Sequence, residues 1–437
     1  MSAAARRWGS LLAGRPGPWL AAGWTVALHL LFLVALPTQL AVNESTDFTT
    51  FYRPVAENAW SGAGWTDRDG QPAVRYPPGF PLLLVPVMAV GGGPGALAVF
   101  VGLCVGVAGG ALFFWARHAT DAVTAGLVAL AFASYPVWLW ATKQPNSELP
   151  FLSLFFLALV AWWRANASRR WPAWALAAGA LVGAAALVRP IAVGLALPLA
   201  VVALLWRQAP RWRRIAAVGL LLAAQLLTVA PWVVWMHEQT GRWMPLSSGG
   251  KLSVLDGLTF AVDPGVEPPP WLSDDVETLM REIGASRAAL GSTHDVLTHV
   301  ARRAASDPAP VAQLLAIKAV RAWYGTESMR LDPWIAAVQA IYLALASFGM
   351  VLLWRAGGER RRLALAILFV VGYFWGMTIL VLSILRYMLP AMALLMVPVA
   401  VAVGRMAQPI LGRPDGLAAS AMADWRSRLA AGGGSSS

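Results

Sequence analysis

Charged residues are scarce in this sequence. Asp, Glu, Lys and Arg make up 13% of its 437 residues, whereas apolar residues make up 58%. A soluble globular domain is about one quarter charged. Because the polar side chains are too few to cover a water-soluble body of this size, soluble enzymes, nucleic-acid-binding proteins and disordered proteins are excluded. The composition predicts a membrane protein that crosses the bilayer several times as helices.

Two further absences exclude particular kinds of site and function. Cys104 is the single cysteine and lies within an apolar run, so a disulfide within the chain and a cysteine-based metal site are excluded. The sequence also lacks the GxxxxGK[ST] loop that cradles nucleotide phosphates, which disfavours ATP-driven transport by this chain.

Ten apolar runs have the length of a membrane span, about 16–25 residues. They cover residues 18–42, 94–116, 121–141, 149–164, 172–188, 191–206, 215–236, 333–354, 363–384 and 387–404. We therefore predict an all-α fold, a polytopic transmembrane bundle of about ten spans. A shorter run at 79–91 begins after two prolines and ends at three glycines, which predicts a half-inserted or interfacial helix.

The cations predict the topology. Arg6, Arg7 and Arg15 precede the first run, and no clear small-residue cleavage site follows it, so we expect an uncleaved first span. If the N-terminus is cytoplasmic, the inside segments carry a charge of +15 and the outside segments −3. This agrees with the positive-inside rule. We expect a protein of the cytoplasmic (inner) membrane with both termini in the cytoplasm.

The polar parts of the chain then fall mainly outside. We expect an N-terminal transmembrane module at 1–236, with a first outer loop at 43–78 that carries the candidate site. An extracytoplasmic helical region follows at 237–332, then transmembrane helices at 333–405 and a cytoplasmic tail at 406–437. The second outer region contains the pattern His294-Asp295-x3-His299. A metal site there would need a third ligand, and none is evident nearby, so we predict no metal.

The first outer loop begins with Asp47, directly after the first span. The stretch TTFYRPVAENAW follows, and it predicts a short interfacial helix with its aromatic side chains toward lipid. Asp47 has two interpretations. It either caps this helix or acts as a general base at the mouth of a cavity, where it would take a proton from an acceptor hydroxyl.

Several motifs resemble a known superfamily. The motifs are an Asp at the end of the first span, the Phe- and Tyr-rich helix, the YPPG return to the membrane, and later stretches in the same order: GAAALVRPIAVGLALPLA, DPAPVAQLLAIKAVRAWYG and SILRYMLPAMALLMVP. Together they resemble the GT-C glycosyltransferases, most closely the branch that uses polyprenyl-phosphate sugars and includes protein O-mannosyltransferases and aminoarabinose transferases. That family often has an adjacent acidic pair in this loop, whereas here Glu44 and Asp47 are separated.

The resemblance implies an inverting, metal-independent transfer of a sugar from a polyprenyl-phosphate donor, without a cofactor, to a lipid, glycan or protein acceptor. It implies Asp47 as the general base and assigns Arg386 to the donor phosphate. Arginine suits that role because its planar fork binds phosphate through paired hydrogen bonds. The alternative for Arg386 is a snorkelling side chain that anchors the end of a helix.

Other polar residues at the outer ends of helices are further candidates. Arg189 and Lys143 are candidates to hold the phosphate or to pair with Glu148, although interfacial anchoring explains both equally well. Glu148 either reflects the preference of a helix start for acidic residues or contacts a sugar hydroxyl. The full set of expected substrate-binding residues is Arg386, Tyr387, Arg75, Tyr76, Lys143, Glu148, Arg189 and Tyr52.

A second function remains open from the sequence, a transporter or lipid-linked glycan flippase without transferase activity. Transporters usually place charged pairs or broken helices at mid-membrane and often contain internal repeats. Here most acidic residues are outside and no repeat is evident, which favours the transferase.

Overall fold

The computed structural model describes residues 10–35, 47–143, 145–205, 209–244, 246–259, 272–326, 329 and 331–411. Within these ranges the chain is helical, and the only β-type pairing is an isolated bridge between Thr66 and Pro72. The predicted all-α class is confirmed.

The helices follow one another along the chain in this order: α2 (Gly17–Ala35), η1 (Phe48–Tyr52), α3 (Arg53–Ser61), α4 (Gly79–Ala89), α5 (Pro94–Ala119), α6 (Ala122–Ala133), α7 (Pro136–Ala141), α8 (Glu148–Ala167), α9 (Trp171–Val188), η2 (Pro190–Ala192), α10 (Ala196–Leu205), α11 (Arg211–Thr240), α12 (Gly250–Thr259), α13 (Asp274–Ala285), η3 (Ser286–Ala288), α14 (Thr293–Ser306), α15 (Pro308–Arg321), α16 (Asp332–Arg355), α17 (Gly358–Leu380), η4 (Leu385–Met388) and α18 (Leu389–Leu411).

Eight helices in the described part are long and apolar enough to cross a membrane: α2, α5, α8, α9, α11, α16, α17 and the helix at Leu385–Ala407. The expected count of about ten is not confirmed, because two predicted runs are shorter or broken. The run at 121–141 divides at Tyr135, whose backbone is extended before Pro136, as proline requires of the residue before it. The run at 191–206 begins with a 3₁₀ turn and reaches α-helical form only at Ala196.

The predicted short helix at 79–91 is confirmed as α4. It has 11 residues, begins after Pro78, and is followed by Gly91 and Gly92, whose φ angles are 96° and 59°. Such left-handed conformations favour glycine, so the glycines end the helix and turn the chain into α5.

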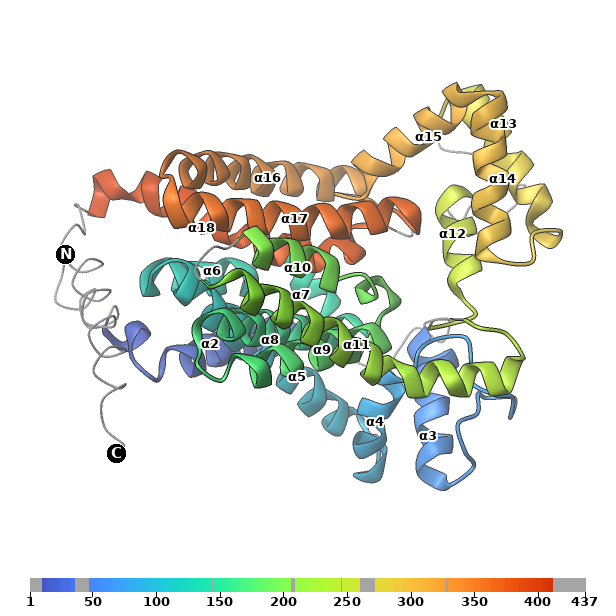
Figure 1. Cartoon of the computed structure of the whole chain (residues 1–437), viewed down its shortest axis with the longest axis horizontal. Helices are drawn as coiled ribbons and strands as arrows, with labels where there is room; N and C mark the ends of the chain where they lie inside the picture. Colours follow the sequence, from blue (N-terminus) through green and yellow to red (C-terminus); the bar gives the residue numbers. More distant parts are fainter. Residues whose placement is uncertain are drawn as a thin grey trace.

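The bundle is built around α8, which is mostly buried. Helices α5 and α9 pack against α8, and α11 packs on the far side of α9. Helices α16, α17 and α18 form a layer along one side of the bundle (Figure 1). Gly179 allows the close approach of α9 and α11, since a Cβ atom there would lie 2.2 Å from the carbonyl oxygen of Leu221.

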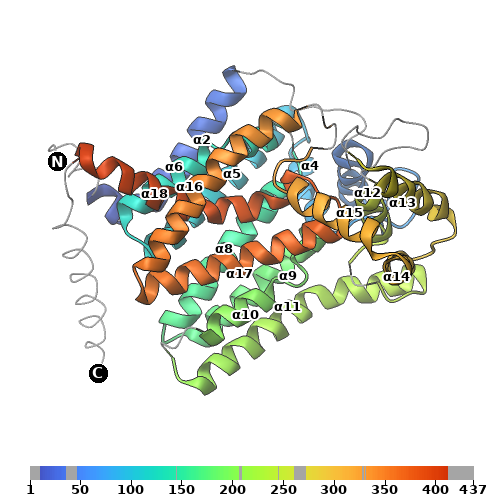
Figure 2. The ribbon, with the colours of Figure 1, turned by 90° about the horizontal axis from the view of Figure 1, so that it is seen from above.

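Helices α12 to α15 form a small unit at one end of the bundle, which we call the cap (Figures 1 and 2). It has its own apolar cluster, which includes Val276, Leu279 and Ile283. Just before the cap, the backbone amides of Ser248 and Gly249 donate to the carbonyl oxygens of Val74 and Arg75, at 3.0 and 3.2 Å. The two long polar segments of the sequence therefore meet at the same end of the molecule.

Candidate active site

Asp47 lies at the entrance of η1, but its side chain does not cap that helix. Its Oδ1 atom instead accepts a hydrogen bond of 2.9 Å from the hydroxyl of Tyr76, which lies in the return segment just before α4. The capping interpretation is therefore wrong. A carboxylate that is held by a phenol from another segment has a fixed direction, as a general base requires.

The aromatic side chains beside Asp47 are buried in protein rather than turned toward lipid, so that expectation is wrong. Phe48, Phe51 and Tyr52 are at most 7% exposed. The Tyr52 ring packs 4.9 Å from Phe80 and 5.2 Å from Tyr76, between ring centroids. The segment from η1 to α3 therefore forms a packed wall beside Asp47.

The two tyrosines stay protonated over the physiological range. Burial raises the pKa of Tyr76 well above its usual value, and the charge of Asp47 raises it further. The pKa of Tyr52 is raised by the same two causes, while the charge of Arg189 opposes the shift. Because Tyr52 is within the electrostatic reach of both Asp47 and Arg189, these two charged groups belong to one region of the protein.

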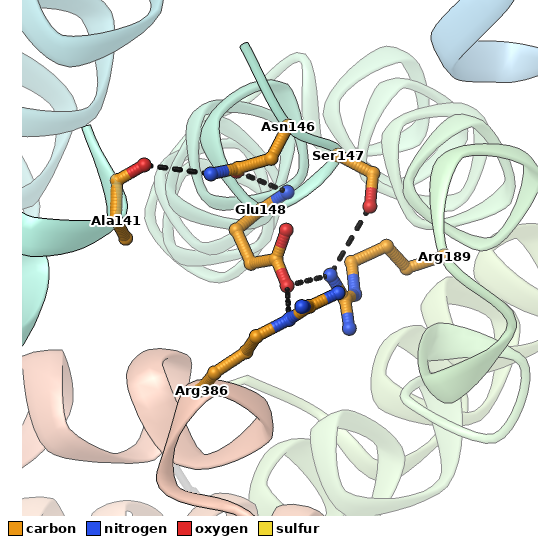
Figure 3. Close-up of polar contacts among 6 residues, drawn as sticks. All are labelled: Ala141, Asn146, Ser147, Glu148, Arg189 and Arg386. Atoms are coloured by element: carbon orange, nitrogen blue, oxygen red, sulfur yellow. Dashed lines mark hydrogen bonds and ion pairs between the residues drawn. The ribbon is translucent and has the colours of Figure 1, made fainter. Parts of the chain in front are cut away.

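A second group of charges gathers on Glu148, at the start of α8 (Figure 3). Its Oε1 atom accepts from Nε of Arg386 at 2.5 Å and also pairs with an Nη atom of Arg189. The same Arg189 nitrogen donates to the hydroxyl of Ser147 at 3.1 Å. The side chain of Glu148 is 3% exposed, and within the described residues its Oε2 atom has no hydrogen-bond partner.

Local sequence explains how these three residues are positioned. The side-chain amide of Asn146 accepts from the backbone N–H of Glu148 at 3.1 Å and so holds the first turn of α8. The backbone of Arg189 is extended because Pro190 follows it. Arg386 lies in η4, the 3₁₀ turn between α17 and α18.

Tyr387 lies beside both arginines. The guanidinium carbon of Arg189 is 4.8 Å from the centre of the Tyr387 ring, and that of Arg386 is 5.9 Å from it. A shallow recess is lined by these three residues, Glu148, Phe151, Leu152, Ile191, Leu389 and Pro390. Two guanidinium groups and one carboxylate leave a net positive charge in this recess, which suits an anion with an apolar tail.

Two of the predicted residues lie apart from this group. The ammonium of Lys143 is 3.7 Å from the centre of the Trp140 ring, so its partner is an aromatic face rather than Glu148. Arg75 is exposed, with its guanidinium 5.2 Å from the centre of the Tyr76 ring. The structure therefore unites Glu148, Arg189, Arg386 and Tyr387, and separately Asp47, Tyr76 and Tyr52.

The histidines of the second polar region have structural partners. Asp295 forms a capping box with Ser292 at the start of α14, and His299 lies 4.0 Å from Glu282. In the part of the chain that the structure describes, no cluster of three potential metal ligands occurs.

The sequence did not reveal two contacts that build the site. One is the bond between Tyr76 and Asp47, and the other is the support of Arg189 by Ser147. Ser147 directly precedes Glu148 in the sequence. Both contacts join segments far apart in the chain, and no local pattern marks them.

We expect Tyr76→Phe to lower kcat by about 10- to 100-fold, because a hydrogen bond to a charged group contributes about 1.5–3 kcal/mol. The protein should remain folded, since the ring that packs on Tyr52 is kept. Steady-state kinetics of the purified protein would measure the effect. Tyr342→Phe, which removes a phenol on α16 far along the chain from Asp47, is the matched control; equal kcat in both variants would contradict the positioning of Asp47 by Tyr76.

We expect Glu148→Gln to lower stability by about 3–5 kcal/mol, the usual effect of removing one partner from a buried ion pair. Thermal unfolding in detergent would show a lower Tm. Glu359→Gln removes a carboxylate that pairs with Arg362 on the surface, where the effect should be small. A Tm for Glu148→Gln equal to that of the control would show that Glu148 does not stabilise the arginines.

The chain is similar to several known proteins. The model of one family, described as dolichyl-phosphate-mannose-protein mannosyltransferase, matches residues 75–235. The oligosaccharyltransferase AglB from Archaeoglobus fulgidus, solved with an inhibitory peptide and a dolichol-phosphate, aligns with 94% of this chain at 14% identity and a TM-score of 0.51. ArnT from Cupriavidus metallidurans, bound to undecaprenyl phosphate, aligns with 90% of this chain and 79% of its own at 20% identity and a TM-score of 0.42. No curated protein matches the chain in sequence.

The chain covers 54% of the AglB chain, so the two share the helical bundle and AglB extends well beyond it. The fold is a bundle of membrane-spanning helices, and the candidate site is a recess lined by two arginines. The family match at residues 75–235 agrees with the resemblance to GT-C glycosyltransferases drawn from the sequence motifs, and the chain shares the fold of AglB.

Proposed function

We propose that this protein transfers a sugar from a polyprenyl-phosphate donor to an acceptor hydroxyl. The observation that carries the proposal is the meeting of Arg189 and Arg386 on one buried carboxylate. The match to the mannosyltransferase family model and the binding of a dolichol-phosphate by AglB support a lipid-linked donor.

The arginines act on the leaving group. As the bond between the sugar and the phosphate oxygen breaks, negative charge grows on the phosphate, and fixed cations stabilise that charge. Glu148 holds the two guanidinium groups in place before the donor binds. The apolar lining of the recess, which includes Phe151 and Leu152, suits the first part of a lipid chain.

Asp47 acts on the acceptor. The acceptor oxygen attacks the anomeric carbon from the face opposite the phosphate, its proton passes to the Asp47 carboxylate, and polyprenyl phosphate leaves. One displacement of this kind inverts the configuration of the anomeric carbon, as the resemblance implies. Tyr76 keeps the carboxylate turned toward the incoming hydroxyl through its 2.9 Å hydrogen bond.

The proposed location of the reaction is the extracytoplasmic side of the inner membrane. The arginine-rich connections between spans favour cytoplasmic termini by the positive-inside rule, and the cap and first loop then lie outside. The acceptor, whether a lipid, a glycan or a protein, would approach from that side. A transporter would instead place its charged residues near the bilayer midplane, whereas here they stand at the ends of α8 and α9 and before α18.

Lipid mass spectrometry tests the proposal. Extracts of the native host would be compared after deletion of the gene and after restoration of the wild-type chain at its normal abundance. Build-up of one polyprenyl-phosphate sugar on deletion, reversed on restoration, is the expected result, and its mass identifies the donor. An unchanged lipid profile under conditions where the pathway is active would contradict the proposal.

A further inference from the structure

Lys318 is buried in an unusual setting between the cap and the bundle. It lies on α15, it is fully buried, and its ammonium donates to two backbone carbonyl oxygens. One belongs to Gly257 on α12, at 2.6 Å, and the other to Val381 at the end of α17, at 2.7 Å. Within the described residues, no carboxylate lies within ion-pair distance of this ammonium.

Burial of a lysine in this setting carries a large desolvation penalty. The sequence holds only three lysines, Lys143, Lys251 and Lys318, and burial of an unpaired ammonium is strongly unfavourable. Burial, followed by repulsion from Arg321, lowers the pKa of Lys318 to about 7. Arg321 forms an ion pair with Asp332 at 3.2 Å. The Asp332 carboxylate is therefore the partner of Arg321 and not of Lys318. A methionine would fill the same space without this penalty, which suggests that the two hydrogen bonds serve a purpose.

The contacts of Lys318 lead directly to Arg386. Val381 caps α17, and the segment after it enters η4, which carries Arg386. On the other side of this segment, the backbone N–H of Leu385 donates to the carbonyl oxygen of Gly325 at 2.9 Å. Gly325 follows α15 by a short turn. The end of α15 and this turn therefore hold the segment 381–385 at both of its ends.

Gly257 makes this arrangement possible. A Cβ atom on Gly257 would lie 2.1 Å from the carbonyl oxygen of Val381, so only glycine lets α12 approach closely enough for one ammonium to reach both carbonyl oxygens. The contact among α12, α15 and the end of α17 therefore depends on glycine at position 257.

We propose that Lys318 is a positioning residue for Arg386: by joining the cap to the end of α17, it fixes the turn that presents this arginine to the donor phosphate. The inference rests on the proposed function in one respect, the role of Arg386 in phosphate binding. It adds that the cap takes part in setting the geometry of the donor site.

Binding of undecaprenyl phosphate to the purified full-length protein tests the proposal. Lys318→Met should weaken binding about tenfold, whereas Lys251→Met, the same substitution at a partly exposed lysine of α12, should leave it unchanged. In the Arg386→Ala background, Lys318→Met should have no further effect, because both changes act through the same arginine. Wild-type affinity in Lys318→Met, or losses that multiply in the double variant, would overturn the proposal.

Hydrogen–deuterium exchange provides a readout that does not depend on the donor. Lys318→Met should accelerate exchange of the Leu385 amide, and Lys318→Gln, which keeps two N–H donors on a shorter side chain, should do so less. This milder variant also serves if Lys318→Met fails to fold. If the wild-type protein does not bind undecaprenyl phosphate, the role of Arg386 in phosphate binding is refuted. Exchange at Leu385 then decides separately whether Lys318 holds the turn, and an unchanged rate would overturn that as well.

Discussion

Asp47→Asn is expected to abolish measurable transfer, with a loss in kcat of about 10²–10⁴-fold, the usual contribution of a general base. The amide keeps the shape of the carboxylate and can still accept the hydrogen bond from Tyr76, so the fold should be retained. What it loses is the ability to take the proton of the acceptor hydroxyl. Turnover assays with the donor and a native membrane fraction as the source of acceptor would measure the effect.

Two comparisons make this result decisive. Glu57→Gln is the matched control, because it removes a carboxylate of the same loop that pairs with Arg53 on the surface; its turnover should equal that of the wild type. The Tm of Asp47→Asn should also be unchanged. Retained turnover in Asp47→Asn would eliminate this residue as the base, and Glu44 would be the next candidate, although it lies outside the described residues.

Arg386→Ala is expected to weaken donor binding by about 10- to 150-fold, as loss of hydrogen bonds to a charged group predicts. Arg386→Lys should lose less affinity than Arg386→Ala, since it keeps the positive charge. It should still bind more weakly than the wild type, because lysine lacks the planar guanidinium that binds phosphate through paired hydrogen bonds. The order of affinities should therefore be wild type, then Lys, then Ala. Calorimetric titration of undecaprenyl phosphate into the protein in nanodiscs would measure it.

The control for this series is Arg355→Ala, which removes an exposed arginine at the far end of α16. It should bind the donor as the wild type does. Equal affinity for the parent and both Arg386 variants would remove this arginine from the phosphate site, and Arg189 would then have to act alone.

Hydropathy predicted the helical membrane fold and the short helix α4, because both depend on local composition. Hydropathy could not predict whether an apolar side chain faces lipid or the protein interior, because both environments are equally apolar. Phe48 and Phe51 could face either environment by their sequence, and only the position of Phe80 and Tyr76 in space decides it. Likewise, the sequence predicted a single long span at 121–141, because one proline within an apolar run does not by itself indicate that the helix is broken.

The candidate site was predictable residue by residue but not as a unit. Arg189 and Arg386 could be recognised separately, since each stands at the end of a helix in a motif. Pairing of Arg189 with Glu148 was one of the predicted alternatives, and the structure confirms it. The addition of Arg386 to this pair could not be predicted, because it depends on how α8, α9 and the α17–α18 turn pack. The role of Lys318 could not be predicted although its stretch is one of the recognised motifs, since a lone lysine in an amphipathic stretch has the pattern of a solvated residue.

The order of residues along the chain has a consequence for biogenesis. Glu148 and Arg189 come from α8 and the end of α9, and both are synthesised long before Arg386. The carboxylate can therefore enter the membrane already paired with one guanidinium, while the second arrives only with the last helices. We expect a nascent chain that ends before α16 to insert stably, yet to lack the positive charge of Arg386 that the proposed phosphate site requires. On the proposed function, competence for the donor would then be acquired only at the final stage of insertion.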